Sequence, residues 1–339
     1  MSDTIQILID GNACGYASHN MDPMTTADGT QVQAVIGFLE TLAHLRKEFP
    51  TANLIVLWDG ASWRNDVLAS YKESRDPDLS EFDLTKPMSE AENKRYAAAA
   101  KKSASRAAYK KQGPFIEEAL RYLAVPQITC FNYEADDLAA VFADRYVEKG
   151  HPVRLVTSDG DWMQLIRNRV VWKANRTPFT FVSAANFHEK AKVGKDVRGF
   201  PNAKTFLEAK LLYGDKGDNV PGIPGFGDVA LSRFFASYGN LSKFFDMPRD
   251  RVETVFRADH GKNAPACILD LHAKGMDCDE LKLARTLMDL RTPDRPAPGD
   301  MKVERGSFDR AGLLALTKRL DLYRLSSDID RFMRTFEGT

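Results

Sequence analysis

The chain has 339 residues, of which 43% are hydrophobic and 28% charged, and its 47 basic and 47 acidic side chains balance, so net charge indicates no partner. No apolar run approaches the roughly 20 residues of a membrane span, and the first residues lack a secretory signal, so we expect a cytoplasmic protein with no membrane partner. The four cysteines form no C-x-x-C pair and the six histidines no H-E-x-x-H motif, which argues against a zinc site and histidine-based catalysis.

Three apolar, β-rich runs each end in an aspartate, and each is typical of a buried parallel strand. They are Ile5–Asp10, Leu54–Asp59 and Val153–Asp159. Helical patterns lie between them over 32–49, 115–123 and 136–148, which predicts an α/β fold with a doubly wound, mostly parallel sheet over residues 1–200. Ligands of such sheets bind beyond the carboxyl ends of the strands, so the three aspartates should face one crevice.

Residues 76–113 interrupt this alternation with a polar, proline-containing stretch followed by a run rich in alanine and lysine. Within it, Lys94–Lys111 carries seven lysines and arginines and no acidic residue. This composition favours helix but offers few apolar side chains to bury, so we expect an exposed helical insertion. A solvated surface helix without a binding role is the alternative interpretation.

After residue 200 the sequence is mainly helical, and residues 201–292 contain a glycine- and proline-rich loop between two expected helices. The helices are Ala203–Tyr213 and Asp228–Tyr238. The Gly-x-Pro-Gly-x-Gly core of the loop predicts a helix-hairpin-helix element, in which backbone amides near Gly222, Gly225 and Gly227 approach a DNA phosphate. An unrelated glycine turn is the alternative. Residues 293–339 are expected to form a helical extension of unknown role.

Nine carboxylates from five segments are predicted near strand ends or helix starts. They are Asp10, Asp59, Glu134, Asp136, Asp137, Asp159, Asp161, Asp215 and Asp218. Helix capping or turn chemistry explains each one alone, but the sheet places three of them at one edge. Two like charges about 4 Å apart repel by on the order of 4 kcal/mol, so this crowding requires cations. An all-oxygen ligand set favours Mg²⁺ or Mn²⁺, and two such ions can promote phosphodiester hydrolysis.

Six ordered motifs resemble those of the 5′ nucleases of the flap endonuclease family, which includes bacteriophage 5′-3′ exonucleases and the N-terminal domain of bacterial DNA polymerase I. They are I-D-G-N at Asp10, W-D-G at Asp59, Y-K-x-x-R-D at Tyr71, Y-E-A-D-D-L at Tyr133, T-S-D-G-D-W-M-Q-L at Thr157 and G-D-K-G-D-N-V-P-G-I-P-G-F-G at Gly214. The resemblance implies a PIN-like 5′ nuclease core.

The resemblance also implies two metal sites. One ion would be held by Asp10, Asp59, Glu134, Asp136 and Asp137, and the other by Asp159, Asp161, Asp215 and Asp218, with Asp137 near both. By the same resemblance, Lys72 stabilises the scissile phosphate, Tyr71 stacks on the terminal base and Arg75 contacts another phosphate. We therefore place Lys72, Asp10, Asp137 and Asp159 in catalysis.

In this family the insertion forms an arch over the active site, through which a single-stranded 5′ end passes. The resemblance therefore makes the basic segment an electrostatic guide, with DNA contacts expected from Lys101, Lys102, Arg106, Lys110 and Lys111. It also implies that the hairpin holds the adjacent duplex and binds a potassium ion through its carbonyl groups.

We therefore predict a stand-alone, monomeric 5′-3′ exonuclease and 5′-flap endonuclease of replication and repair, from a bacterial or phage-infected cell. Its substrates would be DNA with a free 5′ end, a 5′ flap or a single-strand/duplex junction, and RNA/DNA hybrids at primers. An RNA-directed nuclease of the smaller PIN type should lack the hairpin and the second set of acids. A non-catalytic junction-binding protein should have lost ligands, and a small-molecule phosphatase leaves the basic segment unexplained.

Overall fold

A seven-stranded sheet forms the centre of the protein, whose computed structural model describes residues 4–75, 78–175, 179–291 and 295–337. Its strand order is β6-β5-β4-β1-β2-β3-β7. The five inner strands run parallel, whereas the edge strands β6 and β7 are antiparallel to their neighbours. The strands are β1 (Gln6–Asp10), β2 (Asn53–Leu57), β3 (Gln127–Cys130), β4 (Val153–Val156), β5 (Val170–Lys173), β6 (Phe181–Val182) and β7 (Met301–Glu304). The predicted doubly wound sheet is confirmed.

Helices cover both faces of the sheet, and alternate residues of each inner strand enter a different core. Ile7 and Ile9 of β1 pack with helix α2 (Gln33–Glu48) in one core. Leu8 lies in the other core with helix α5 (Ala135–Glu148). Burial on both faces explains why these strands are apolar without a polar alternation.

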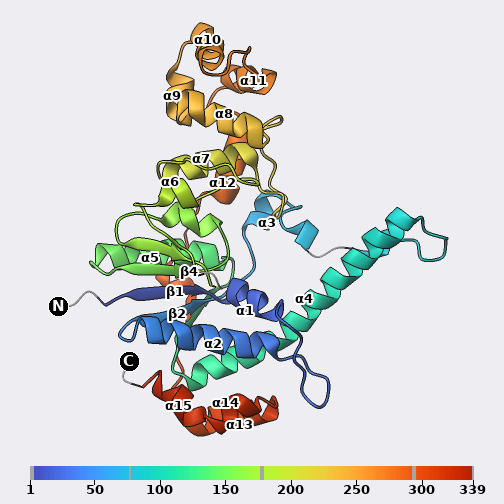
Figure 1. Cartoon of the computed structure of the whole chain (residues 1–339), viewed down its shortest axis with the longest axis vertical. Coiled ribbons are helices and arrows are strands. Elements are labelled where there is room, and N and C mark those ends of the chain that lie inside the picture. The colour runs from blue at the N-terminus through green and yellow to red at the C-terminus, as the bar shows by residue number, and fades with distance from the viewer. Residues whose placement is uncertain (1–3, 76–77, 176–178, 292–294, 338–339) are drawn as a thin grey trace.

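Helix α4 (Glu90–Tyr122) is a single element of 33 residues, and its first part projects from the body (Figure 1). A capping box of Ser89 and Glu92 starts it. Its last turns pack on the sheet domain, where Gln112 is buried and accepts a hydrogen bond from the Ala34 amide at 2.8 Å. The predicted insertion therefore does not end at residue 113, because this anchored helix continues through Pro114 into the core.

Six helices between residues 203 and 288 form a tower above the sheet domain in Figure 1. Helix α7 (Ala203–Tyr213) and helix α8 (Asp228–Tyr238) flank the glycine-rich loop, as predicted. Next come α9 (Leu241–Asp246), α10 (Arg249–His260), α11 (Ala266–Lys274) and α12 (Asp279–Met288). Helix α12 packs against α7 and so brings the chain back to the sheet domain.

The segment predicted as a helical extension is only partly helical. Its first described element is β7, which pairs with β3 and completes the sheet. Helices α13 (Arg310–Arg319), α14 (Tyr323–Ser327) and α15 (Ile329–Arg334) then pack below α2 and α4 (Figure 1). The predicted boundaries at residues 76 and 293 lie outside the described residues. Within the described part of the chain, no helix is long and apolar enough to cross a membrane.

Candidate active site

The three strand-end aspartates meet at the carboxyl edge of the sheet, as predicted from topology. Asp10 ends β1 and accepts hydrogen bonds from the Ala13 amide and the Thr157 hydroxyl, both at 2.8 Å. Asp59 follows β2 and accepts from the Asn12 side chain at 2.7 Å. Asp159 follows β4, and its Oδ1 accepts from the Asp161 amide at 2.8 Å. Each carboxylate is therefore held by donors from the loop that carries it or from its neighbour.

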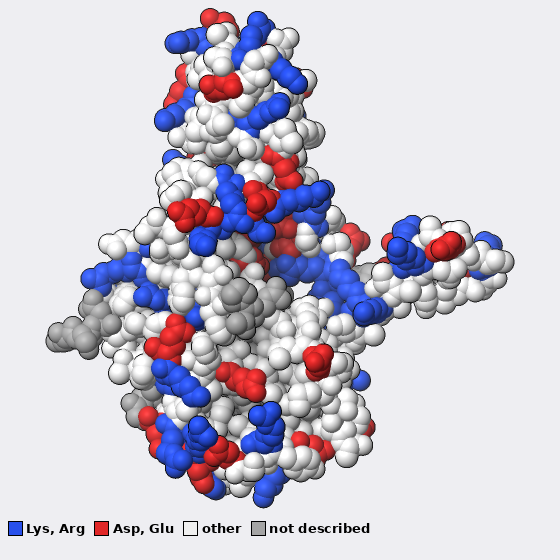
Figure 2. Space-filling model, in the orientation of Figure 1, with Lys and Arg blue, Asp and Glu red and all other residues white. Residues whose placement is uncertain are grey.

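A cleft of about 450 Å³ lies at this edge and has walls of opposite charge. Its acidic wall contains Asp10, Asp59, Asp136 and Asp159. Its basic wall is formed by Lys72, Arg75, Lys102, Arg106 and Lys110. In Figure 2, Lys and Arg side chains gather where the projecting part of α4 meets the body of the protein.

The raised pKa values of the aspartates in the acidic wall show that their negative charges are unfavourable there. Burial, then the nearby Asp59 carboxylate, raises the pKa of Asp10 to about 7. Burial, then Asp161, raises the pKa of Asp159 to about 6. Burial and Asp159 raise the pKa of Asp136 well above its ordinary value, although the Trp162 indole N–H donates to Asp136 at 2.6 Å. Mutual repulsion in a desolvated cleft is the environment that a divalent cation relieves.

Asp137 points into a buried ion pair rather than into the cleft. Arg64, which is 1% exposed, donates to both carboxylate oxygens of Asp137 at 2.7 and 2.9 Å and to Glu134 at 3.2 Å. The Arg64 Nε–H also donates to the Leu287 carbonyl in α12 at 2.7 Å. The structure therefore differs from our expectation for Asp137, because a bidentate guanidinium already occupies both of its oxygens.

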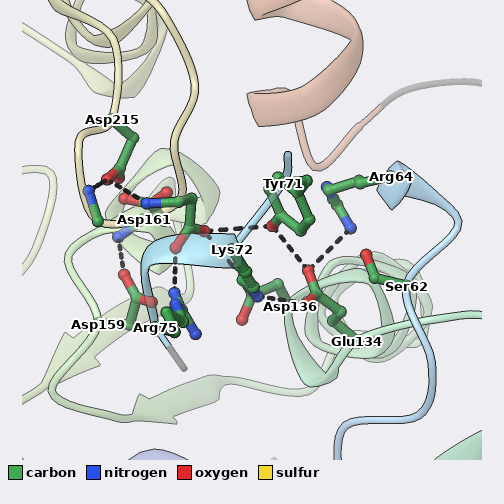
Figure 3. A network of polar contacts seen from close by, with 12 residues as sticks. Ser62, Arg64, Tyr71, Lys72, Arg75, Glu134, Asp136, Asp159, Asp161 and Asp215 are labelled. Carbon is green, nitrogen blue, oxygen red and sulfur yellow. Dashed lines mark hydrogen bonds and ion pairs between the residues drawn. The ribbon is translucent and has the colours of Figure 1, made fainter. Parts of the chain in front are cut away.

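Tyr71 and Lys72 lie between the acids (Figure 3), and of the two only Lys72 lines the cleft. The Tyr71 ring is 6% exposed, and its hydroxyl lies 3.0 Å from Glu134 and 3.2 Å from Asp218. This burial leaves no ring face for a terminal base, contrary to the predicted stacking. Lys72 pairs with Glu134 and lines the cleft, and its φ of 59° is accompanied by a hydrogen bond from its amide to the Asp218 carbonyl.

The remaining three acids are neutralised by basic side chains. Lys210 of α7, which is 8% exposed, bridges Asp161 and Asp215. Burial opposes its charge, but these two acids raise the pKa of Lys210 above its usual value. Arg75 pairs with Asp218. Among the described residues, no three Asp, Glu, His or Cys side chains are grouped closely enough to hold a metal ion as they stand.

The ligand chemistry nevertheless fits divalent cations. Asp10, Asp59, Asp136 and Asp159 form no ion pair with any described residue, and all four line the cleft. Oxygen-only donors with net negative charge are what Mg²⁺ and Mn²⁺ require. This open set combines members of both predicted ligand groups, because Asp159 lies on the same wall as Asp10.

The predicted DNA-binding residues of α4 fall into two groups, those that line the cleft and those that do not. Lys102, Arg106 and Lys110 are spaced four apart and face the cleft, as neighbours on one side of a helix do. Lys102 donates to the Ser74 carbonyl at 2.7 Å and Arg106 to the Arg75 carbonyl at 2.9 Å. Lys101 and Lys111 are exposed and do not line this cleft.

The glycine-rich loop has the close backbone approach that was expected. A Cβ on Gly222 would lie 2.3 Å from the Tyr213 carbonyl group, and Gly225 has a φ of +89°. Gly227 caps the start of α8. The loop therefore requires glycine at two of the three predicted positions, and a helix N-terminus follows it.

Sequence reasoning missed the residues that hold the acids in place. Arg64 and Lys210 neutralise them, and Asn12, Thr157 and Trp162 donate to them. Asn12, Thr157 and Trp162 stand inside the quoted motifs, so these motifs could have identified them as site residues. Arg64 and Lys210 stand outside every motif.

Comparisons with known proteins agree with this geometry. Residues 6–192 match the family described as 5′-3′ exonuclease, N-terminal resolvase-like domain. The chain is 27% identical over 318 residues to thermostable DNA polymerase I of Thermus aquaticus, which covers 93% of this chain and 32% of the polymerase. DNA polymerase I of Pseudomonas aeruginosa is 25% identical over 336 residues, 98% of this chain and 32% of that protein. The chain thus spans about a third of these relatives.

Two solved structures share the fold. The zinc-bound T5 5′-exonuclease has a TM-score of 0.60 at 20% identity, covering 97% of this chain and 99% of that one. Flap endonuclease-1 from Methanococcus jannaschii has a TM-score of 0.54 at 16% identity, covering 98% and 92%. The shared architecture therefore extends beyond the matched N-terminal region, through the tower and β7.

Proposed function

This chain belongs to the 5′-3′ exonuclease family, and on that premise we propose that it is a metal-dependent 5′-3′ exonuclease and 5′-flap endonuclease acting on DNA. The observation that carries the proposal is the cleft with one acidic and one basic wall. The acidic wall suits divalent cations, and the basic wall suits the phosphates of a single strand. A strand lying between the walls would place its phosphodiester bond against the carboxylates.

We assign Mg²⁺ or Mn²⁺ as the cofactor. Asp10, Asp59, Asp136 and Asp159 would hold one ion. Asp161, Asp215 and Asp218 would hold a second ion in place of the Lys210 and Arg75 groups that neutralise them here. Two bound ions supply stabilisation of the attacking and leaving oxygens in phosphodiester hydrolysis. Glu134 and Asp137 would stabilise this arrangement from outside the cleft, through their ion pairs with Arg64.

The basic residues position the substrate. Lys72 and Arg75 contact the phosphates nearest the acids, and the Lys102, Arg106 and Lys110 face of α4 guides the single strand. The glycine-rich loop and the start of α8 bind the adjacent duplex through backbone amides, and the loop carbonyls hold a potassium ion. This division of labour explains why the chain carries both an arch and a hairpin.

Removal of 5′ flaps and RNA primers in replication and repair is the proposed task, carried out by a monomer in the cytoplasm of a bacterial or phage-infected cell. RNA/DNA hybrids are included as substrates because phosphate contacts do not distinguish the sugar. The hairpin and the acids around Asp215 argue against a smaller PIN-type RNA nuclease. Retention of all nine acids argues against a non-catalytic junction-binding protein.

The test is to incubate a 5′-flap duplex, a nicked duplex and single-stranded RNA with Mg²⁺, with Mn²⁺ or with a chelator. We expect flap cleavage with either metal and none with the chelator. Absence of metal-dependent flap cleavage would refute the proposal. Cleavage confined to the RNA would favour the PIN-type alternative.

A further inference from the structure

A second cavity, of about 370 Å³, adjoins the cleft on the far side of Asp59. It shares Asn12, Asp59, Tyr109 and Lys110 with the cleft, so the two spaces meet at these residues. Its volume falls in the range of about 300–1,000 Å³ typical of small-ligand sites. A group that leaves the cleft past Asp59 would enter this cavity.

Strands β3 and β7 form the floor of the cavity. Gln127 is paired with Glu304 and Thr129 with Lys302, so these four side chains project to the same face of the sheet. The roof is α4, which contributes Tyr109, Lys110 and Glu117. The C-terminal segment thus completes a cavity beside the carboxylates.

The polar groups in the cavity suit a nucleotide with its base inside and its phosphate at the mouth. Lys110 and Lys302 supply positive charge. Glu117 and Glu304 repel phosphate but accept hydrogen bonds from amino groups of a base. Glu304 already pairs with Arg121 at 3.1 Å, which holds it at the sheet edge.

Phe131 adds an aromatic surface at the same edge. It directly follows β3 and is 82% exposed, more than any other large hydrophobic side chain described. Its carbonyl accepts a hydrogen bond from the Ala61 amide at 2.7 Å, which fixes the backbone next to the Asp59 loop. Phe131 stands in the turn that follows β3, the strand whose Gln127 and Thr129 line the cavity. An exposed ring held on a fixed backbone is a stacking platform for a base.

The order of the strands in the sheet determines which nucleotide of the substrate reaches the cavity. Asp159, Asp10 and Asp59 stand at the ends of β4, β1 and β2. Helix α7, which leads into the glycine-rich loop, packs on the 3₁₀ helix η3 (Asp161–Leu165) that follows β4. The cavity lies at β3 and β7, on the other side of these three aspartates from η3 in the strand order. A strand that runs from duplex at the hairpin across the acids therefore arrives at the cavity with its 5′ side.

We propose that the cavity between α4 and the β3–β7 edge, together with Phe131 in the turn after β3, binds the first unpaired nucleotide of a 5′ flap. This inference rests on the proposed nuclease function and deepens it. It gives the C-terminal strand β7 a role in substrate selection, since Lys302 and Glu304 would contact the first flap nucleotide. A nicked duplex without a flap would leave the cavity empty.

The experiment compares kcat/KM for a 5′-flap duplex and for the matching nicked duplex, in the full-length protein with Mg²⁺. Phe131→Ala should lower the ratio of flap to nick cleavage by about tenfold, the effect of losing one stacked base. Val303→Ala, which removes a 47% exposed side chain from the other face of β7, should leave the ratio within about twofold of wild type.

A flap whose first nucleotide lacks its base provides a second measurement. Wild type should lose about tenfold on this abasic flap, and Phe131→Ala should lose little more, because both changes remove the same contact. An unaltered ratio in Phe131→Ala, or independent losses on the abasic flap, would overturn the inference while leaving the nuclease function intact. If wild type cleaves neither duplex, the proposed function itself fails and the inference falls with it.

Discussion

Replacing Arg64 by methionine should lower the free energy of unfolding by about 3–5 kcal/mol. Arg64 is 1% exposed, and Asp137, to which it donates two hydrogen bonds, is 4% exposed. Without the guanidinium, the Asp137 carboxylate stays buried without an opposite charge. Methionine fills similar apolar space, so the loss reflects the stranded charge and the lost bond to the Leu287 carbonyl rather than a cavity.

Urea unfolding of the metal-free protein measures this loss, provided that the dependence on urea is the same in each variant. The double variant Arg64→Met with Asp137→Leu removes both charges and should recover most of the stability, with a coupling of about 2 kcal/mol or more. The stability of Arg64→Lys should lie between those of wild type and Arg64→Met, because lysine keeps the charge but cannot form the two parallel hydrogen bonds of the guanidinium. A loss below about 1 kcal/mol in Arg64→Met, or simple addition of the single losses in the double variant, would refute this reasoning.

Three further predictions concern the cleft. The raised pKa values of Asp10 and Asp159 mean that the folded chain binds these protons more tightly than the unfolded chain. Their stabilising contribution is therefore complete below about pH 4 and is lost through about pH 6 to 7, by as much as about 4 kcal/mol for Asp10. Urea midpoints without metal should fall over that range and Mg²⁺ should reduce the fall; a rise would contradict the assignment. Asp159→Asn should abolish hydrolysis but leave flap-duplex affinity, measured by fluorescence anisotropy, within a few-fold of wild type; binding lost together with activity would contradict it. Lys102→Ala should reduce the slope of log affinity against log salt by about 0.7 on single-stranded DNA. The neighbouring Lys101→Ala should reduce this slope by much less. Equal slopes in the two variants would favour the interpretation of the basic segment as a solvated helix without a binding role.

The sheet and the gathering of the acids were predictable because each depends on a local pattern. An apolar run that ends in aspartate marks a buried strand and its carboxyl end, and topology then brings Asp10, Asp59 and Asp159 together. The glycine-rich loop between α7 and α8 was predictable for a similar reason, since Gly222 and Gly225 occupy positions that only glycine fills without strain.

The pairing of the acids was not predictable, because it depends on contacts between distant segments. Arg64 reaches Asp137 across 73 residues, and Lys210 reaches Asp161 across 49. The sequence around Arg64 and around Lys210 contains no motif that indicates a buried basic side chain. Strand β7 is four residues long, with exposed residues at its centre, so its pattern is too short to reveal a strand. The predicted end of the insertion at residue 113 was wrong, because α4 continues through Pro114 with Gln112 and Ile116 buried on either side of it.

Because α4 is one continuous helix, its projecting part moves as a single rod about the turns that are buried at Gln112. About 22 residues extend from the buried anchor at Gln112 to the first turn at Glu90, a lever of about 33 Å. A tilt of about 10° at the anchor moves the free end by about 6 Å, whereas bending the rod itself would break its own hydrogen bonds. The width of the cleft beneath the projecting part of α4 is therefore set by the packing of α2 and the C-terminal helices on the last turns of α4, and by the hydrogen bonds from Lys102 and Arg106 to the Ser74 and Arg75 carbonyls.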